Sequence, residues 1–137
     1  MLTIALSLLI LSVIAAVAIG LKYLLAGSYT TYHAQVTGKP WEQIEPRLQM
    51  IILGMMRIIG AGFLSLGASV AWFSYALFLG ARWAPWALAS VALTGLLASL
   101  WVSLQLRKAE PRADTPIVPS AVGLGLILLG AAAGSLA

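Results

Sequence analysis

The run from Leu48 to Leu79 is the feature that most constrains the fold, because it is strongly apolar and carries a single charge, Arg57. A helix over these roughly 30 residues would be a rod of about 50 Å at 1.5 Å per residue. Crossing about 30 Å of hydrocarbon at a tilt near 40° uses only about 39 Å of helix. The run is therefore too apolar to be solvated and too long to be one upright membrane span.

Two placements of the membrane span fit this run. In the first, residues 58–79 cross the membrane, residues 48–56 form an inner extension, and Arg57 lies at the headgroups. In the second, the span begins at Leu48 and ends near Trp72, which places Arg57 about 14 Å deep, near the midplane. Aromatic residues crowd the turn that follows, as in an interfacial belt; they are Trp72, Phe73, Tyr75, Phe78, Trp83 and Trp86. They favour a placement of Arg57 inside the bilayer.

Three further apolar runs are long enough to cross a bilayer, which takes about 20 residues. Charged residues make up only 9% of the chain, against about 25% in soluble domains. The runs lack the alternation of a β-barrel, and open sheets leave backbone groups unpaired in lipid. We therefore predict an all-α integral membrane four-helix bundle in one transmembrane domain, residues 1–137, with helices at about 2–25, 46–79, 84–106 and 117–136.

The connections between these helices predict how the chain is threaded. The first connection is long and polar and could hold a short interfacial helix. The first and third connections carry six basic residues, Lys22, Lys39, Arg47, Arg107, Lys108 and Arg112, whereas the second carries only Arg82. By the positive-inside rule, loops 22–47 and 107–116 should be cytoplasmic and both termini outside. We expect the cytoplasmic (inner) membrane of a bacterium.

Composition excludes several classes of chemistry. The chain has no cysteine, which removes disulfides, thiol catalysis and thiolate metal sites. The formal net charge of +4 comes from residues at helix ends, where orientation signals are expected, so nucleic acid is not a predicted partner. No nucleophile with an attendant base, phosphate-binding loop or metal cluster is present. We predict no cofactor, no metal and no catalytic residue, and lean towards a protein that is not an enzyme.

Small residues recur at four-residue spacing in three predicted spans, which is typical of faces where helices approach closely. They are Ser12, Ala16 and Gly20; Gly95, Ser99 and Ser103; and Gly130 and Gly134. Ser99 and Ser103, together with Ser65 and Ser69, could also line a polar path, although membrane serines commonly bond to their own helix or to a neighbour.

Arg57 is the strongest candidate for a functional residue. Counting in fours along its helix gives the polar or small series Glu45, Gln49, Leu53, Arg57, Ala61, Ser65 and Ser69, which predicts that this stripe faces protein. An intramembrane arginine costs at least about 2.5 to 3.5 kcal/mol and needs a partner. Three alternatives remain: snorkelling to the inner headgroups, pairing with Glu42 or Glu45, or contact with an anionic or carbonyl-bearing ligand in a cavity lined by Ser65, Ser69 and Trp72.

The remaining candidates lie in the first polar loop. His33 is the only histidine, and a lone loop histidine is more often solvated or hydrogen-bonded than a proton relay or metal ligand. Glu42 and Glu45 are three residues apart and would share a helical face, but no histidine completes a Glu-x-x-His motif. Charge compensation at a helix start explains both glutamates.

These observations predict a small polytopic membrane protein that acts as an accessory or assembly subunit of a larger membrane complex, or as a homo-oligomer. Its predicted partners are the lipid bilayer and other membrane subunits or further copies of the chain. The alternative is a small transporter or a lipid- or amphiphile-binding protein in which Arg57 contacts the ligand. A third hypothesis is a membrane enzyme that acts on lipids through His33 and the loop glutamates.

Overall fold

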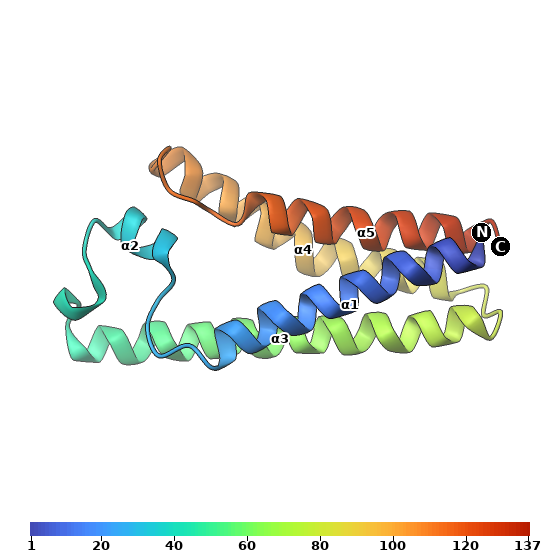
Figure 1. Cartoon of the computed structure of the whole chain (residues 1–137), viewed down its shortest axis with the longest axis horizontal. Coiled ribbons are helices and arrows are strands. Elements are labelled where there is room, and N and C mark those ends of the chain that lie inside the picture. Colours follow the sequence, from blue (N-terminus) through green and yellow to red (C-terminus); the bar gives the residue numbers. More distant parts are fainter.

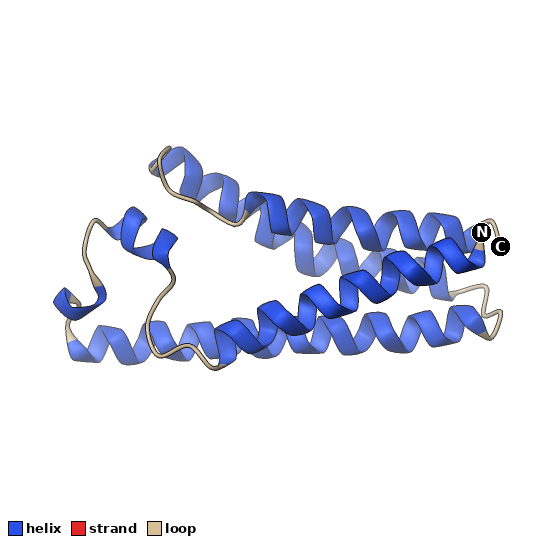
Figure 2. Ribbon diagram, viewed as in Figure 1, coloured by secondary structure: helices blue, strands red, loops and turns tan.

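The computed structural model describes all residues from Met1 to Ala137, and its regular elements are all helical (Figures 1 and 2). The elements are α1 (Leu2–Leu24), α2 (Thr31–Thr37), a 3₁₀ turn η1 (Trp41–Gln43), α3 (Pro46–Phe78), α4 (Ala84–Ala109) and α5 (Ile117–Ser135). The four long helices are apolar enough to cross a membrane. The predicted all-α membrane fold is confirmed, and each long helix begins and ends within three residues of its predicted bounds.

The four long helices form a ring in which α1 packs against α3, α3 against α4, α4 against α5, and α5 against α1. Both termini lie at one end of this ring, and α2 lies at the other (Figure 1). We call the half nearer the termini the terminal half and the half nearer α2 the loop half. The first and third connections therefore share one side of the bundle.

The hydrophobic core lies in the terminal half. Its largest fully buried side chains come one from each long helix: Leu9, Val70, Leu88 and Ile127. Around them pack further buried residues from the same ends of the helices, among them Ala5, Leu77, Ala92 and Ala131. This half of the bundle is closed by apolar side chains.

Glycines set the close approach of α1 and α3. A Cβ atom on Gly60 would lie 2.6 Å from the backbone nitrogen of Leu24 and 2.7 Å from the carbonyl oxygen of Gly20. Further along, a Cβ on Gly67 would lie 3.4 Å from the Cβ of Ala16. The predicted close-packing role of Gly20 is therefore confirmed. On α5, a Cβ on Gly130 would lie 2.8 Å from the side chain of Leu9 and 3.3 Å from the carbonyl oxygen of Ala5, and one on Gly134 would lie 2.6 Å from the side chain of Leu77.

The level at which α1 and α3 pack against each other also locates Arg57. Because Gly60 lies level with the end of α1, the first 14 or so residues of α3, roughly 21 Å of helix, extend past the end of its partner. Arg57 lies in this extension, within about one turn of the level of Lys22. This register places Arg57 beside the end of α1, as the placement with Arg57 at the headgroups requires. Trp72, Tyr75 and Phe78 occupy the last two turns of α3, at the end of the bundle that holds both termini.

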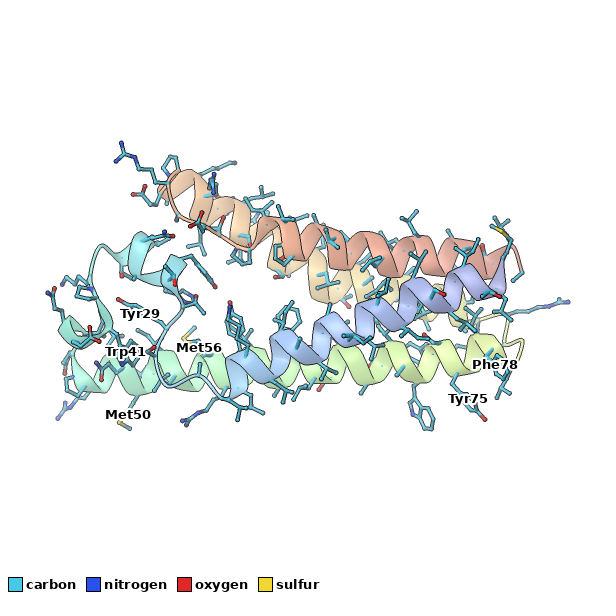
Figure 3. All side chains as sticks on the ribbon, viewed as in Figure 1. Tyr29, Trp41, Met50, Met56, Tyr75 and Phe78 are labelled. Carbon is cyan, nitrogen blue, oxygen red and sulfur yellow. The ribbon has the colours of Figure 1, made fainter.

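The first polar loop folds against the α3 extension. Tyr23, Tyr29, Ile44 and Met56 form a small buried cluster there, separate from the main core. Figure 3 shows Tyr29 and Trp41 gathered over Met56, while Met50 points away from the loop. The ring of Trp41 meets Tyr29 edge-on, with centroids 5.0 Å apart. The helix expected in this loop is present as α2, which ends at Gly38 with a φ of 66°.

Candidate functional site: a cleft between the four long helices

The residues predicted to surround Arg57 do not form a site in this chain. Arg57, Ala61 and Ser65 are exposed, Ser69 is half-buried, and Trp72 is 72% exposed. The buried face of α3 instead carries Met56, Gly60, Gly67, Val70 and Leu77. The prediction that the Arg57 stripe packs against protein is wrong for this bundle, and none of Arg57, Ser65, Ser69 and Trp72 lines the cleft between the four long helices.

The predicted residues of the first loop have local structural roles. Gln49 donates from Nε2 to the carbonyl oxygen of Trp41 at 2.8 Å, which ties η1 to α3. Glu45 is the residue before the first turn of α3, and Glu42 lies in η1; both are exposed. No group of His, Asp or Glu side chains in the chain could hold a metal ion.

His33 holds the start of α2 together. It forms a capping box with Thr30, in which the backbone N–H of Thr30 donates to Nδ1 of His33 at 3.2 Å. Nδ1 also lies 2.9 Å from Oγ1 of Thr30. Burial lowers the pKa of His33 below its ordinary value of 6.5. The neutral ring, with its proton on Nε2, is the form that this geometry requires.

The structure contains a cleft of about 700 Å³ in the loop half, bounded by all four long helices. Its apolar walls include Ile19, Phe63, Leu66, Val102 and Ile127. The remaining lining residues are Ser12, Ala15, Ala16, Lys22, Tyr23, Thr30, Tyr32, Ile59, Gly62, Gly95, Leu96, Ala98, Ser99, Ser103, Leu106, Asp114, Thr115, Pro116, Pro119, Ser120 and Gly123. Figure 1 shows α1 and α5 converging near the termini and separating towards α2.

Small side chains explain why the cleft is open. Ten of its 26 lining residues are Gly, Ala or Ser. A Cβ on Gly62 would meet nothing within 4 Å, and one on Gly95 would make only an ordinary contact of 3.7 Å with Leu66. The helices therefore present too little side-chain volume to fill the interior in this half.

Hydroxyl groups supply most of the polarity of the cleft. The hydroxyls of Ser99 on α4 and Ser120 on α5 lie 3.1 Å apart, and those of Tyr23 and Tyr32 lie 3.0 Å apart. Thr115 is 9% exposed, and its Oγ1 is buried without a hydrogen-bond partner. The two hydroxyl pairs can each donate a hydrogen bond to a molecule inside the cleft, whereas Oγ1 of Thr115 is itself covered.

Two charged residues, Lys22 and Asp114, also line the cleft, and both are exposed. They come from the end of α1 and from the third connection, so they mark its mouth. Asp114 is tied to α2, because its backbone N–H donates to Oε1 of Gln35 at 2.8 Å and its Oδ2 accepts from Nε2 of Gln35 at 3.3 Å. These bonds join the first and third connections, the two that the positive-inside rule predicts to lie on the same side of the membrane.

Burial raises the pKa of Tyr32 above its ordinary value, and the hydrogen bond with Tyr23 adds to this effect. The phenol of Tyr32 therefore keeps its proton at neutral pH. It is a hydrogen-bonding group at the mouth and not an anion.

The sequence did not predict the cleft. Its signal was the spacing of Ser12 with Ala16 and of Gly95 with Ser99 and Ser103, which we interpreted mainly as close-packing faces. The suggestion that serines line a polar path holds for Ser99 and Ser103 but not for Ser65 and Ser69. Thr115 and Tyr32 carried no signal in the sequence, because the chain alone does not show that they meet at one opening.

Comparison with known proteins adds no further assignment. No protein-family model matches the sequence, and neither a curated protein nor a solved structure is significantly similar to it. The function must therefore be inferred from the cleft and from the exposed surfaces of the helices.

Proposed function

We propose that this integral membrane protein binds an amphiphile in the cleft. The observation that carries the proposal is the cleft itself, about 700 Å³ between four membrane helices with largely apolar walls. Pockets for small ligands typically measure about 300 to 1,000 Å³ and combine apolar walls with a few placed polar groups. The proposal keeps the amphiphile-binding alternative from the sequence but moves the contact from Arg57 to the cleft.

The position of the cleft supports a ligand with one apolar and one polar end. The apolar part would lie deep, between Phe63, Leu66 and Val102. The polar end would lie towards the mouth, where the hydroxyls of Tyr32, Ser99 and Ser120 line the cleft. A transport route would also need an opening through the terminal half, which the core fills. The geometry thus favours binding over transport.

Filling the cleft tests this function. Gly95→Leu places a larger side chain on the lining of the cleft. Gly54→Leu makes the same change at a position on α3 that does not line this cleft and where a Cβ would meet nothing within 4 Å. Lipids that copurify in mild detergent would be quantified by mass spectrometry. We expect the Gly95→Leu protein to lose a lipid component that wild type and Gly54→Leu retain. Identical lipid content in all three folded proteins would refute the proposal.

The side on which the mouth opens follows from the basic connections. We propose that loops 22–47 and 107–116 face the cytoplasm of a bacterial cell, so that the ligand enters from the inner leaflet. Because the chain has no cysteine, single cysteines at Ser28 and Ser135 would report orientation cleanly. Labelling of the Ser28 site, and not the Ser135 site, by an impermeant maleimide added to intact cells would reverse this orientation.

A second function, assembly with other membrane subunits or with copies of itself, is favoured by the outer face of the α3 extension. Leu48, Ile51, Met55 and Ile58 recur at helical spacing there and are 45%, 59%, 58% and 73% exposed. Much of this stripe lies beyond the end of α1, so α1 does not cover it. Such contiguous apolar surface marks an interaction site.

Site-specific crosslinking tests this assembly function. A photoreactive amino acid at Met55 would be compared with one at Leu97, which is 50% exposed on the lipid-facing side of α4. We expect a discrete crosslinked product from the Met55 site in native membranes and none from the Leu97 site. Equal, diffuse labelling from both sites would remove the assembly function.

A further inference from the structure

We infer that the cleft selects an uncharged amphiphile, whose hydroxyl, ester or carbonyl oxygen accepts hydrogen bonds from Thr115 and from the Ser99–Ser120 pair. The inference rests on the proposed binding function and specifies the class of ligand. Long-chain alcohols, diacylglycerols and isoprenoid quinones share this chemistry. Three observations carry it: an unpartnered hydroxyl, a surplus of donors, and the distribution of charge.

The unpartnered hydroxyl belongs to Thr115. The backbone of Thr115 is already used, because its N–H donates to the carbonyl oxygen of Ala113 at 2.9 Å and its own oxygen accepts from Ile117 at 2.8 Å. The side-chain hydroxyl alone is left over, buried beside the cleft. Buried polar groups in folded proteins nearly always have a partner. Oγ1 is itself closed off from the cleft, so a ligand oxygen would supply this partner once rotation about χ1 turns the hydroxyl towards the cleft.

The surplus of donors comes from pairing among hydroxyls. In the Ser99–Ser120 pair one hydroxyl donates to the other, so one hydrogen remains free whichever way the bond runs. Ser12 and Ser103 differ, because each donates to a carbonyl oxygen of its own helix, at 2.7 Å and 2.8 Å. The free hydrogens in the cleft are therefore neutral O–H donors, which match an uncharged acceptor oxygen.

The distribution of charge excludes an ionised group inside the cleft. The only charged lining residues are Lys22 and Asp114, which have opposite signs and lie at the mouth. Tyr32 is neutral, since burial raises its pKa. An ammonium or phosphate drawn past the mouth would lose hydration without gaining a counter-charge, which is strongly unfavourable. A neutral headgroup meets no such penalty.

Matched photoreactive probes test the inference. The protein would be placed in nanodiscs of phosphatidylcholine with diazirine-bearing 1-hexadecylglycerol, hexadecyl sulfate or hexadecyltrimethylammonium, which share a chain and differ in charge. Labelled peptides would be mapped by mass spectrometry. We expect 1-hexadecylglycerol to label cleft peptides at concentrations at least about tenfold lower than either charged probe.

Two variants assign the selectivity to the hydroxyls. Thr115→Val keeps the shape and removes the hydroxyl, and should weaken labelling by the glycerol probe about five- to tenfold, whereas Thr115→Ser should retain it. The double variant Ser99→Ala/Ser120→Ala should weaken it several-fold. Thr94→Val is the control, because Thr94 donates to the carbonyl oxygen of Ser90 on the outer side of α4 and does not line the cleft.

The outcomes separate the two proposals. Equal labelling of the cleft by charged and neutral probes would overturn the neutral class while leaving binding intact, as would wild-type labelling in both folded hydroxyl variants. If Gly95→Leu fails to reduce labelling by any probe, the cleft is not the binding site and the proposed function itself fails. The double serine variant keeps the test decisive if Thr115→Val does not fold.

Discussion

The terminal half and the loop half of the bundle are built from the same four helices, yet one is closed and the other open. In the terminal half, each helix contributes a large side chain to the centre, as with Leu9 and Leu88, which are fully buried. In the loop half, interior positions carry Gly62, Gly95 and Gly123 with several alanines and serines. The difference shows that side-chain volume along one helix, rather than helix identity, decides where a membrane bundle encloses space.

This division separates stability from binding within a short chain. The filled half fixes how the helices cross, and the open half can accept a ligand without disturbing that packing. Substitutions in the two halves should therefore have different signatures. Changes in the terminal half should lower stability, whereas changes in the loop half should alter occupancy of the cleft.

The largest expected effect is the loss of packing in the terminal half. Leu9→Ala removes a side chain that is 0% exposed and should lower the free energy of unfolding by about 2 to 5 kcal/mol. Ile59→Ala is the counterpart in the loop half, where the side chain is 44% exposed and lines the cleft. It should cost less than about 1 kcal/mol, because truncation only enlarges an existing space.

Unfolding of both variants would be followed by tryptophan fluorescence in mixed micelles with increasing dodecyl sulfate. If Ile59→Ala proved as costly as Leu9→Ala, the cleft would have to be filled by a tightly packed molecule under those conditions. Repeating the titration with delipidated protein would distinguish the loss of contacts with such a bound molecule from a general effect of shortening an α3 side chain.

The helices were predictable because hydropathy and Pro or Gly at their ends are local properties of the chain. The helix faces that pack against one another were not predictable in this way. Each step of four residues turns about 40° further than one full turn, so the series from Glu45 to Ser69 winds most of the way around α3. The buried face of α3 advances instead by steps of four, seven, three and seven residues, through Met56, Gly60, Gly67, Val70 and Leu77, which keeps it on one side of the helix. A four-residue stripe is therefore reliable over two or three steps only.

The position of Arg57 relative to the other helices is likewise not a property of its own helix. It depends on the register between α1 and α3, and that register is fixed by the contact of Gly60 with Leu24, which are far apart in the sequence. The cleft depends in addition on the separation of α1 from α5. Neither quantity is encoded by the pattern of any single span.

The next effect in size compares two glycines of α3, Gly60 and Gly62, which are two residues apart and lie on different sides of the helix. Gly60→Ala would place a methyl group 2.6 Å from a backbone nitrogen of α1, and backbone cannot yield as a side chain can. We expect a loss of about 1 to 3 kcal/mol. Gly62→Ala should be neutral or slightly stabilising, because its Cβ meets nothing within 4 Å and alanine favours the helix. Thermal unfolding in one detergent measures both, and equal melting temperatures would contradict the tight α1–α3 contact.

The smallest expected effect is a pH dependence of the stability of α2, the helix that lies over the mouth of the cleft. The pKa of His33 is lowered in the folded chain, so the unfolded segment binds a proton more readily than the folded one. The stability of α2 should be fully present above the unfolded value of about 6.5. It should then decline as the pH falls below that value towards the folded pKa, because a protonated Nδ1 cannot accept the N–H of Thr30. The loss should be about 1 kcal/mol or less.

His33→Gln is the matched variant for this effect, because glutamine at the third helical position also completes a capping box but does not titrate. Hydrogen exchange of α2 amides, measured by mass spectrometry at pH 7.5 and pH 5.5, would be divided by the exchange of His33→Gln at the same pH, which cancels the intrinsic pH dependence of exchange. We expect the ratio to rise at pH 5.5 for peptides covering Thr31–Thr37. An unchanged ratio would show that His33 does not hold α2 in place. The Gln35–Asp114 bonds and the Tyr23–Tyr32 contact would then be what holds α2 over the cleft.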